Sequence, residues 1–237
     1  MNANCAHGGR CCWKMSVRYR IDAVKVSSAA PYVIWPSKVN VRESLLDKLH
    51  PTQTRIFKSV IVDVKMKIAI EPETEGDYEG ITKVHTAAFN RDGEARLVEK
   101  LRKTPAYIPE LSLVARYRNA IIGHILLYPV KINAYKKKCN SLALAPISVI
   151  PRFQNKKVGS ILIKEDLEKA QKLGFKSVIV VGHPEYYPRF GFEKASKYGI
   201  SPPFNVPDTA FFAIELEKDG LKNCNGTIEY PSEYNEV

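Results

Sequence analysis

Apolar and polar residues follow regular periods from Met66 to about residue 217, and this pattern predicts alternating strands and helices. Some segments carry apolar residues at helical spacing, whereas others are short apolar runs typical of buried strands. Helices are expected over residues 77–89, 94–102 and 158–173, with a short one over 185–190. Strands are expected over residues 67–70, 112–117, 121–131, 142–150, 177–181 and 210–217, with Pro146 interrupting the fourth.

The order of these elements predicts an α/β fold with a mixed sheet. Arg118 and Asn119 form a tight turn between two strands, so those strands make an antiparallel hairpin. Further along the chain, a strand, the helix over 158–173 and a second buried strand follow one another. Such a unit forms a right-handed parallel crossover. We therefore expect parallel and antiparallel pairing in one sheet, with helices on both faces.

Residues 1–65 lack this regularity, since only residues 39–49 and 57–64 suggest a short helix and a strand. The net charge of +11 is concentrated here: residues 1–65 hold eleven Lys and Arg against four Asp and Glu. The sequence therefore predicts a basic, weakly ordered extension over 1–65 and one folded domain over 66–237. Met66 is a candidate natural start, which would make the extension non-native upstream sequence.

A basic extension raises nucleic-acid binding as an alternative function. Clustered Lys and Arg with interleaved aromatic residues are not evident in it, so we favour a solvated arm over a nucleic-acid partner. No run of about 18 apolar residues predicts a membrane span. No apolar stretch of a secretory signal follows Arg10 and Lys14. We expect a cytoplasmic protein without a membrane partner.

The five cysteines are odd in number and irregularly spaced, which argues against a disulfide framework. We expect reduced thiols, as in the cytoplasm, with Cys139 in a hairpin loop. A small metal site made by Cys5, His7, Cys11 and Cys12 is the alternative. However, Cys11 and Cys12 are adjacent, and no second ligand pair follows at zinc-finger spacing. We therefore expect no metal site.

The loop between the strand over 142–150 and the helix over 158–173 is suited to binding an anion. Free backbone N–H groups lie there at the positive end of the helix dipole. Gly159 allows close approach of a ligand or a positive φ, and Lys156 and Lys157 add positive charge. A diphosphate fits this description, as does an ordinary strand-to-helix loop with solvated charges.

This segment resembles motif A of the GNAT superfamily of N-acetyltransferases, in which Gln/Arg-x-x-Gly-x-Gly/Ala leads from a strand into a helix. Gln154, Val158 and Gly159 match the motif, whereas Lys157 stands where the family usually has glycine. Residues 185–192 resemble motif B, an aromatic pair followed by Phe/Leu-Gly-Phe. Both motifs at this separation are more specific than either alone.

Shorter matches extend the resemblance to residues 67–217 and to a bacterial subgroup of predicted N-acetyltransferases, leaving residues 1–65 outside. These matches are His85-x-x-Ala88-Phe89, Glu94-Ala95-x-Leu97-Val98, Ile122-Gly123-His124-Ile125, and Pro207-Asp208 with Phe211.

The resemblance implies a sheet splayed between two parallel strands, with acetyl-CoA as the cosubstrate. Its pantetheine would lie like an extra strand and bond backbone groups near Ile147 and Val149. The N–H of Val149 would polarise the thioester carbonyl. The loop that holds the diphosphate would consist of Gln154, Asn155, Lys156, Lys157, Val158, Gly159 and Ser160.

The resemblance also implies that a neutral amine attacks the acetyl carbon directly, without an acyl-enzyme. Tyr187 matches the family's acid, which reprotonates the leaving thiolate, and a packing aromatic beside Phe190 and Phe192 is the alternative. His124 is a candidate base, although a lone strand histidine is more often a hydrogen-bonded core residue. Other candidates for the base are Glu94, His183, Glu185 and water.

The acceptor stays open between small-molecule and peptide amines, and a homodimer is consistent with similar proteins. The alternative functions are a non-catalytic acyl-CoA sensor, and nucleic-acid binding through residues 1–65. Intact Tyr187 favours the enzyme over the sensor.

Overall fold

The computed structural model describes residues 67–135 and 137–236 of the chain. The expectations for residues 1–65, including the basic extension and the alternative metal site, lie outside the described residues. Among the described residues, no group of three or more His, Cys, Asp and Glu side chains could hold a metal ion. None of the helices in this part of the chain has the length and apolar character that crossing a membrane requires.

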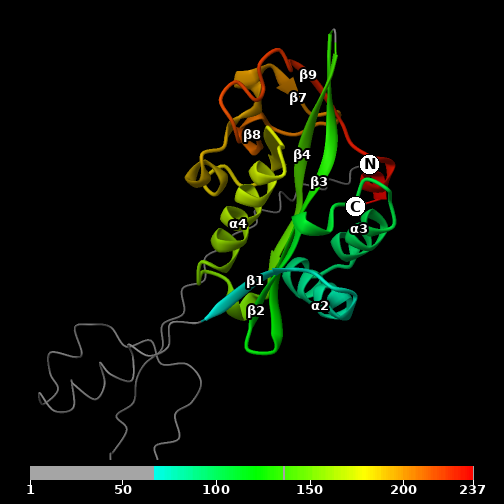
Figure 1. Cartoon of the computed structure of the whole chain (residues 1–237), viewed down its shortest axis with the longest axis vertical. Helices are drawn as coiled ribbons and strands as arrows, with labels where there is room; N and C mark the ends of the chain where they lie inside the picture. The colour runs from blue at the N-terminus through cyan, green and yellow to red at the C-terminus, as the bar shows by residue number, and fades with distance from the viewer. Residues whose placement is uncertain (1–66, 136, 237) are drawn as a thin grey trace, which may run out of the picture. The chain divides into compact units, whose positions relative to one another are not determined.

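Nine strands of the described residues form one mixed sheet (Figure 1): β1 (Ile68–Pro72), β2 (Ser112–Tyr117), β3 (Ala120–Ala134), β4 (Lys137–Val149), β5 (Ser177–Val181), β6 (Glu193–Lys194), β7 (Ile200–Ser201), β8 (Phe211–Glu215) and β9 (Gly226–Glu229). Seven of them lie in the order β1-β2-β3-β4-β5-β8-β6, and β9 pairs with β3 and β7. Two pairs are parallel, β4 with β5 and β7 with β9, and the others are antiparallel.

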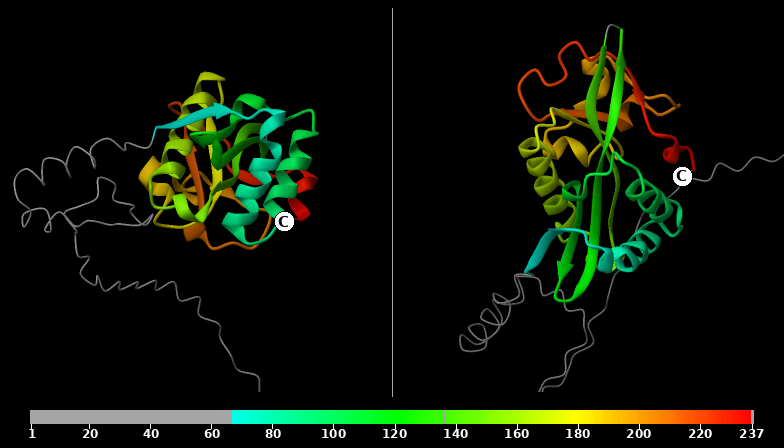
Figure 2. Two further views of the ribbon diagram at one scale, coloured as in Figure 1. Left: turned by 90° about the horizontal axis from the view of Figure 1, so that it is seen from below. Right: turned by 45° about the vertical axis from the view of Figure 1, so that its right-hand side comes forward.

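Three α-helices of the described part cover the sheet: α2 (Tyr78–Phe89), α3 (Gly93–Arg102) and α4 (Val158–Lys172). Figures 1 and 2 show α2 and α3 on one face and α4 on the other. Short 3-10 turns connect the elements: η2 (Glu75–Asp77), η3 (Pro109–Leu111), η4 (Pro151–Phe153), η5 (Tyr187–Phe190), η6 (Ala195–Tyr198), η7 (Asp208–Ala210) and η8 (Ser232–Glu236). The predicted α/β fold, with a mixed sheet and helices on both faces, is confirmed.

Most predicted boundaries agree with the structure, and the differences have local causes. Pro146 does not interrupt β4: the strand runs through it, and the register of β3 shifts opposite it, between Ile125 and Leu127. The predicted short helix over 185–190 is the 3-10 turn η5, whose second residue is Pro188. Strands β6, β7 and β9 were not predicted.

The main core lies between the sheet and α4. Leu162 and Ile163 of α4 are fully buried, as are Leu113, Ile125 and Leu142 of the facing strands. Burying one such side chain stabilises the fold by about 1.5–3 kcal/mol. This packing fixes the start of α4 against the end of β4, where the anion-binding loop was predicted.

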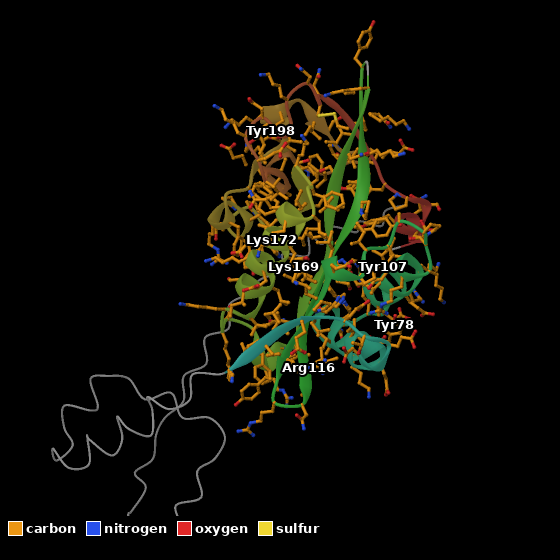
Figure 3. The ribbon with its side chains drawn as sticks, viewed as in Figure 1. Tyr78, Tyr107, Arg116, Lys169, Lys172 and Tyr198 are labelled. Carbon is orange, nitrogen blue, oxygen red and sulfur yellow. A yellow bond between two sulfur atoms is a disulfide. The ribbon has the colours of Figure 1, made fainter. Side chains whose placement is uncertain are left out.

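Cys139 and Cys224 form a disulfide, so the expectation of reduced thiols is wrong for this pair; sulfur is yellow in Figure 3. Their Cα atoms are 5.9 Å apart, although 85 positions separate them in the sequence. Strand β9 brings them together: it begins just after Cys224, its Ile228 pairs with Ile132 of β3, and Ile132 pairs with Cys139. Cys139 therefore lies within β4 rather than in a hairpin loop.

The parallel strands β4 and β5 separate along their length. They pair only at Leu142 with Val178 and at Ala143 with Ile179. Beyond Ala143, β4 continues to Val149 while paired with β3 on its other edge. The predicted splay between two parallel strands is therefore present, and it leaves the second half of β4 with an open edge.

Candidate active site

Backbone N–H groups of β4 point toward this open edge. The N–H of Ile150 donates to the carbonyl of Ile122 in β3, at 3.0 Å. Because successive N–H groups of a strand point to opposite sides, those of Val149 and Ile147 point away from β3, toward the side from which β5 has separated. The two residues predicted to bind pantetheine thus face the groove with backbone donors and acceptors.

The loop from Gln154 to Ser160 follows directly and ends in the first turn of α4. Asn155 and Lys157 adopt the left-handed conformation, with φ of 60° and 66°. Lys157, which stands where the GNAT motif usually has glycine, thus has a backbone conformation that favours glycine. The side chain of Gln154 turns back, and its Nε2 donates to the carbonyl of Val149 at 3.0 Å. The predicted loop residues therefore lie beside the open edge of β4.

Gly159 lies at the closest approach between α4, β4 and the aromatic residues of motif B. A Cβ atom there would lie 2.8 Å from the hydroxyl of Tyr186 and 3.7 Å from Cγ2 of Val149. A side chain at this position would displace the Tyr186 hydroxyl, and Gly159 itself has no positive φ. Tyr186, which the sequence reasoning did not single out, has its hydroxyl beside Gly159, and the guanidinium of Arg189 lies over its ring at 4.5 Å.

Tyr187 is buried beside the groove, with 6% of its surface exposed. Its ring packs edge-on against Phe192 and at a tilt against Phe212, with centroids 5.7 and 6.2 Å away. Gly182, just after β5, leaves room for it, because a Cβ there would lie 2.1 Å from the ring. Burial, with a smaller contribution from Tyr186, raises the pKa of Tyr187, so the phenol stays protonated.

His124 lies on the α2–α3 face of the sheet and is fully buried. Its Nδ1 is 2.9 Å from Nε2 of His85, and its Nε2 is 2.9 Å from Oγ of Ser112 and 3.2 Å from Oε2 of Glu73. Burial lowers the pKa of His124 despite the nearby carboxylate. Both ring nitrogens of His124 have hydrogen-bond partners. Its role as the base therefore stays a prediction, since neither nitrogen is free to accept a proton.

Glu73 anchors this network between β1 and α3. Arg102 donates to its two carboxylate oxygens at 2.7 Å each, and the hydroxyl of Tyr107 donates to Oε1. Burial alone raises the pKa of Glu73, but the hydrogen bonds from Arg102, His124 and Tyr107 outweigh it and hold the pKa far below its usual value. Figure 3 labels Tyr107 and also Tyr78, on whose ring the Arg102 guanidinium lies at 4.0 Å.

The remaining candidates for the base differ in exposure. Glu94 is 6% exposed and forms an ion pair with Arg91, whereas His183 and Glu185 are exposed after β5. Sequence reasoning missed Glu73 and the pairing of His85 with His124. Glu73 is 51 positions from His124, and only the sheet and its helices bring them together.

A surface cavity of about 690 Å³ lies elsewhere, between α2, the turn from β2 to β3, and residues 150–152. It contains none of the predicted site residues. Its Arg116 is paired with Asp77 at 2.9 Å, and its Lys83 with Glu79 at 2.6 Å. The chemistry therefore points to the groove at β4 and not to this cavity.

Comparison with known proteins agrees with this geometry. Residues 69–195 match the family model described as an acetyltransferase (GNAT) domain. The uncharacterized N-acetyltransferase YjhQ of Escherichia coli K12 is 37% identical over 135 residues, which are 56% of this chain and 75% of YjhQ.

Two solved structures of 28% identity share the fold. One is the GNAT family N-acetyltransferase YhbS from Escherichia coli in complex with CoA, with a TM-score of 0.67 over 73% of this chain and 94% of YhbS. The other is a GNAT family acetyltransferase from Brucella melitensis in complex with acetyl-CoA, with a TM-score of 0.58 over 71% and 99% of the two chains. The chain thus belongs to the GNAT family of N-acetyltransferases and is an acyltransferase.

Proposed function

We propose that this protein transfers the acetyl group of acetyl-CoA to a primary amine of a small molecule or peptide. The observation that carries the proposal is the open edge of β4, with the N–H groups of Ile147 and Val149 directed into it. Solved relatives that share the fold are complexes with CoA and with acetyl-CoA. The groove fits such a cosubstrate, because it combines main-chain donors with an anion-binding loop.

The loop over 154–160 supplies the diphosphate site of this proposal. The first turn of α4 offers N–H groups without helical partners, and the dipole of this 15-residue helix favours an anion there. Lys156 and Lys157 add positive charge, and Gly159 keeps the entrance free of a side chain. The same site is lined by backbone and side-chain atoms of Gln154, Asn155, Val158 and Ser160.

The chemical roles follow from position and protonation. The N–H of Val149 polarises the thioester carbonyl as charge develops on its oxygen. The amine attacks the acetyl carbon directly, so no acyl-enzyme is needed. Tyr187 then gives its proton to the leaving thiolate. Its raised pKa keeps the phenol protonated before the transfer and makes it a weaker acid than an exposed tyrosine.

We further propose that residues 66–237 carry this activity and that residues 1–65 are a dispensable extension. We also propose that the protein forms a homodimer and is located in the cytoplasm. The Cys139–Cys224 disulfide removes the cysteine argument for that location, because disulfides are rare in reducing compartments.

Thermal unfolding with acetyl-CoA and with longer acyl-CoAs tests binding. A ligand at 100 times its Kd stabilises the folded state by about 2.7 kcal/mol. A panel of amines, followed by the release of free CoA thiol, then tests transfer. Acetyl-CoA that fails to stabilise the protein would refute the proposal, whereas stabilisation without thiol release for any amine would favour the acyl-CoA sensor.

A further inference from the structure

The buried network around His124 fixes which nitrogens carry protons. Glu73 is ionised and can only accept, so the neighbouring Nε2 of His124 carries the hydrogen. Neutral His124 then has a bare Nδ1, which must accept from Nε2–H of His85 at 2.9 Å. The chain of hydrogen bonds therefore ends at Nδ1 of His85, which holds a lone pair and no proton.

This terminal nitrogen is one of three buried polar atoms on the same face that have no hydrogen-bond partner among the described residues. The others are the hydroxyl of Tyr234, which packs beside α3, and Oγ of Ser148, a residue only 4% exposed. Ser148 pairs with His124 across β3 and β4, so the two side chains are neighbours on one face of the sheet. His85 contacts that same His124 from α2.

Ser148 also connects these atoms to the groove. It lies between Ile147 and Val149, whose N–H groups point to the open edge of β4. Ser148 is thus adjacent to the proposed reaction centre, on the face opposite α4, and His85 is connected to it through His124. Unpaired buried polar groups are costly, so each one calls for an explanation, and a catalytic role is one of them.

We propose that His85 is the base of the reaction and that it receives the amine's proton through the hydroxyl of Ser148. This assignment rests on the proposed function. Neither atom has a hydrogen-bond partner in the structure, so binding of the acceptor has to turn the Ser148 hydroxyl toward Nδ1 of His85. The attacking amine then gives an N–H proton to Oγ of Ser148, whose own proton passes to Nδ1 of His85. Glu73 and His124 are positioning residues, since they hold His85 in the tautomer with a free Nδ1.

Burial lowers the pKa of His85 to about 2, and the neighbouring His124 and Arg102 add to this, so the base is unprotonated in the resting enzyme. Burial therefore opposes protonation of His85, and the carboxylate of Glu73 works in the other direction. The amine nitrogen gains a positive charge and becomes acidic as it bonds to the acetyl carbon, which drives its proton toward the histidine chain.

Chemical rescue tests the assignment in the full chain. Hydroxylamine serves as the acceptor, because it is small and uncharged at neutral pH. Its acetyl transfer is measured as CoA thiol release. We expect His85→Ala to lower kcat/KM about 100-fold, with acetyl-CoA affinity unchanged, and added imidazole to restore part of the loss. Ser148→Ala should lower it about 10-fold without rescue by imidazole.

Full activity in His85→Ala would overturn the base assignment, and full activity in Ser148→Ala would overturn the bridging role. His85→Gln, which keeps a polar group at this buried site, replaces the alanine variant if the latter does not fold. If wild-type protein neither binds acetyl-CoA nor releases thiol, the proposed function itself fails.

A measurement on the resting protein tests the tautomers of His85 and His124 independently of catalytic activity. Long-range 1H–15N correlation spectra of the resting protein should show His85 and His124 both protonated at Nε2. Glu73→Gln should abolish that preference in both rings, whereas Glu99→Gln, at an exposed ion pair with Lys103, should leave it intact. A proton on Nδ1 of His85 in the wild-type protein would exclude the chain as described.

Discussion

At the scale of single residues, Tyr187 combines a buried phenol with a position beside the groove. We expect Tyr187→Phe to lower kcat about 100-fold, since the leaving thiolate loses its proton donor. The affinity for acetyl-CoA should be unchanged, because the ring keeps its packing against Phe192 and Phe212. Steady-state kinetics and calorimetric titration check the two expectations, and unchanged turnover would leave Tyr187 as a packing residue.

Single residues also show where sequence reasoning stops. Gln154, Gly159 and Tyr187 were found because they belong to short segments with a motif of their own. Glu73 and His85 act through contacts with His124, 51 and 39 positions away. Nothing local in the sequence distinguishes a histidine with two bonded nitrogens from one with a free nitrogen, so the better candidate for the base appears only in the folded chain.

At the scale of elements, the junction between β4 and α4 contains a strained residue. Lys157 precedes α4 with φ of 66°, a conformation that costs a non-glycine residue about 1 kcal/mol. Lys157→Gly should therefore raise the free energy of unfolding by up to about 1 kcal/mol and leave acetyl-CoA affinity equal or higher. Urea unfolding and calorimetric titration measure both quantities.

Lys156→Gly is the matched control, because Lys156 has the same charge and no positive φ. It should give no gain in stability. A large loss of affinity in Lys157→Gly alone would show that the lysine is a direct contact of the cosubstrate.

The buried ion pair between Glu73, which follows β1, and Arg102 of α3 predicts that stability depends on pH. The folded-state pKa of Glu73 is depressed, so its stabilising effect is present above the unfolded value of about 4.3 and is lost as pH falls toward the folded value. The difference in unfolding free energy between wild type and Glu73→Gln should therefore be constant above about pH 6 and shrink below about pH 4. Urea unfolding at a series of pH values measures it, and a difference that grows on acidification would contradict the ion pair with Arg102.

Elements that have a hydrophobic pattern of their own were predicted. Strands that are defined by pairing with a distant strand, or are too short to show a period, were not. The strands Ser112–Tyr117 and Ser177–Val181 have the predicted bounds, since each is a short apolar run between turns. Strands β6 and β7 have two residues each, which is too short for any period. Strand β9 exists because it pairs with the far half of β3, more than 90 positions earlier in the chain.

At the scale of the whole molecule, the C-terminal segment is joined to the sheet by both pairing and a covalent bond. The Cys139–Cys224 disulfide closes a loop of 85 positions. Cross-linking a loop of this length reduces the entropy of the unfolded chain and stabilises the fold by about 4.6 kcal/mol. We expect the double variant Cys139→Ser, Cys224→Ser to lose about that much unfolding free energy.

Because the disulfide lies at the end of the sheet away from Gly159 and Tyr187, the double variant should keep the acetyl-CoA affinity of the wild type at temperatures where it is folded. A reducing agent should lower the melting temperature of the wild type and leave that of the double variant unchanged, which separates this bond from the other three cysteines. Equal melting temperatures for the oxidised wild type and the double variant would show that pairing between β9 and β3 alone holds the C-terminal segment.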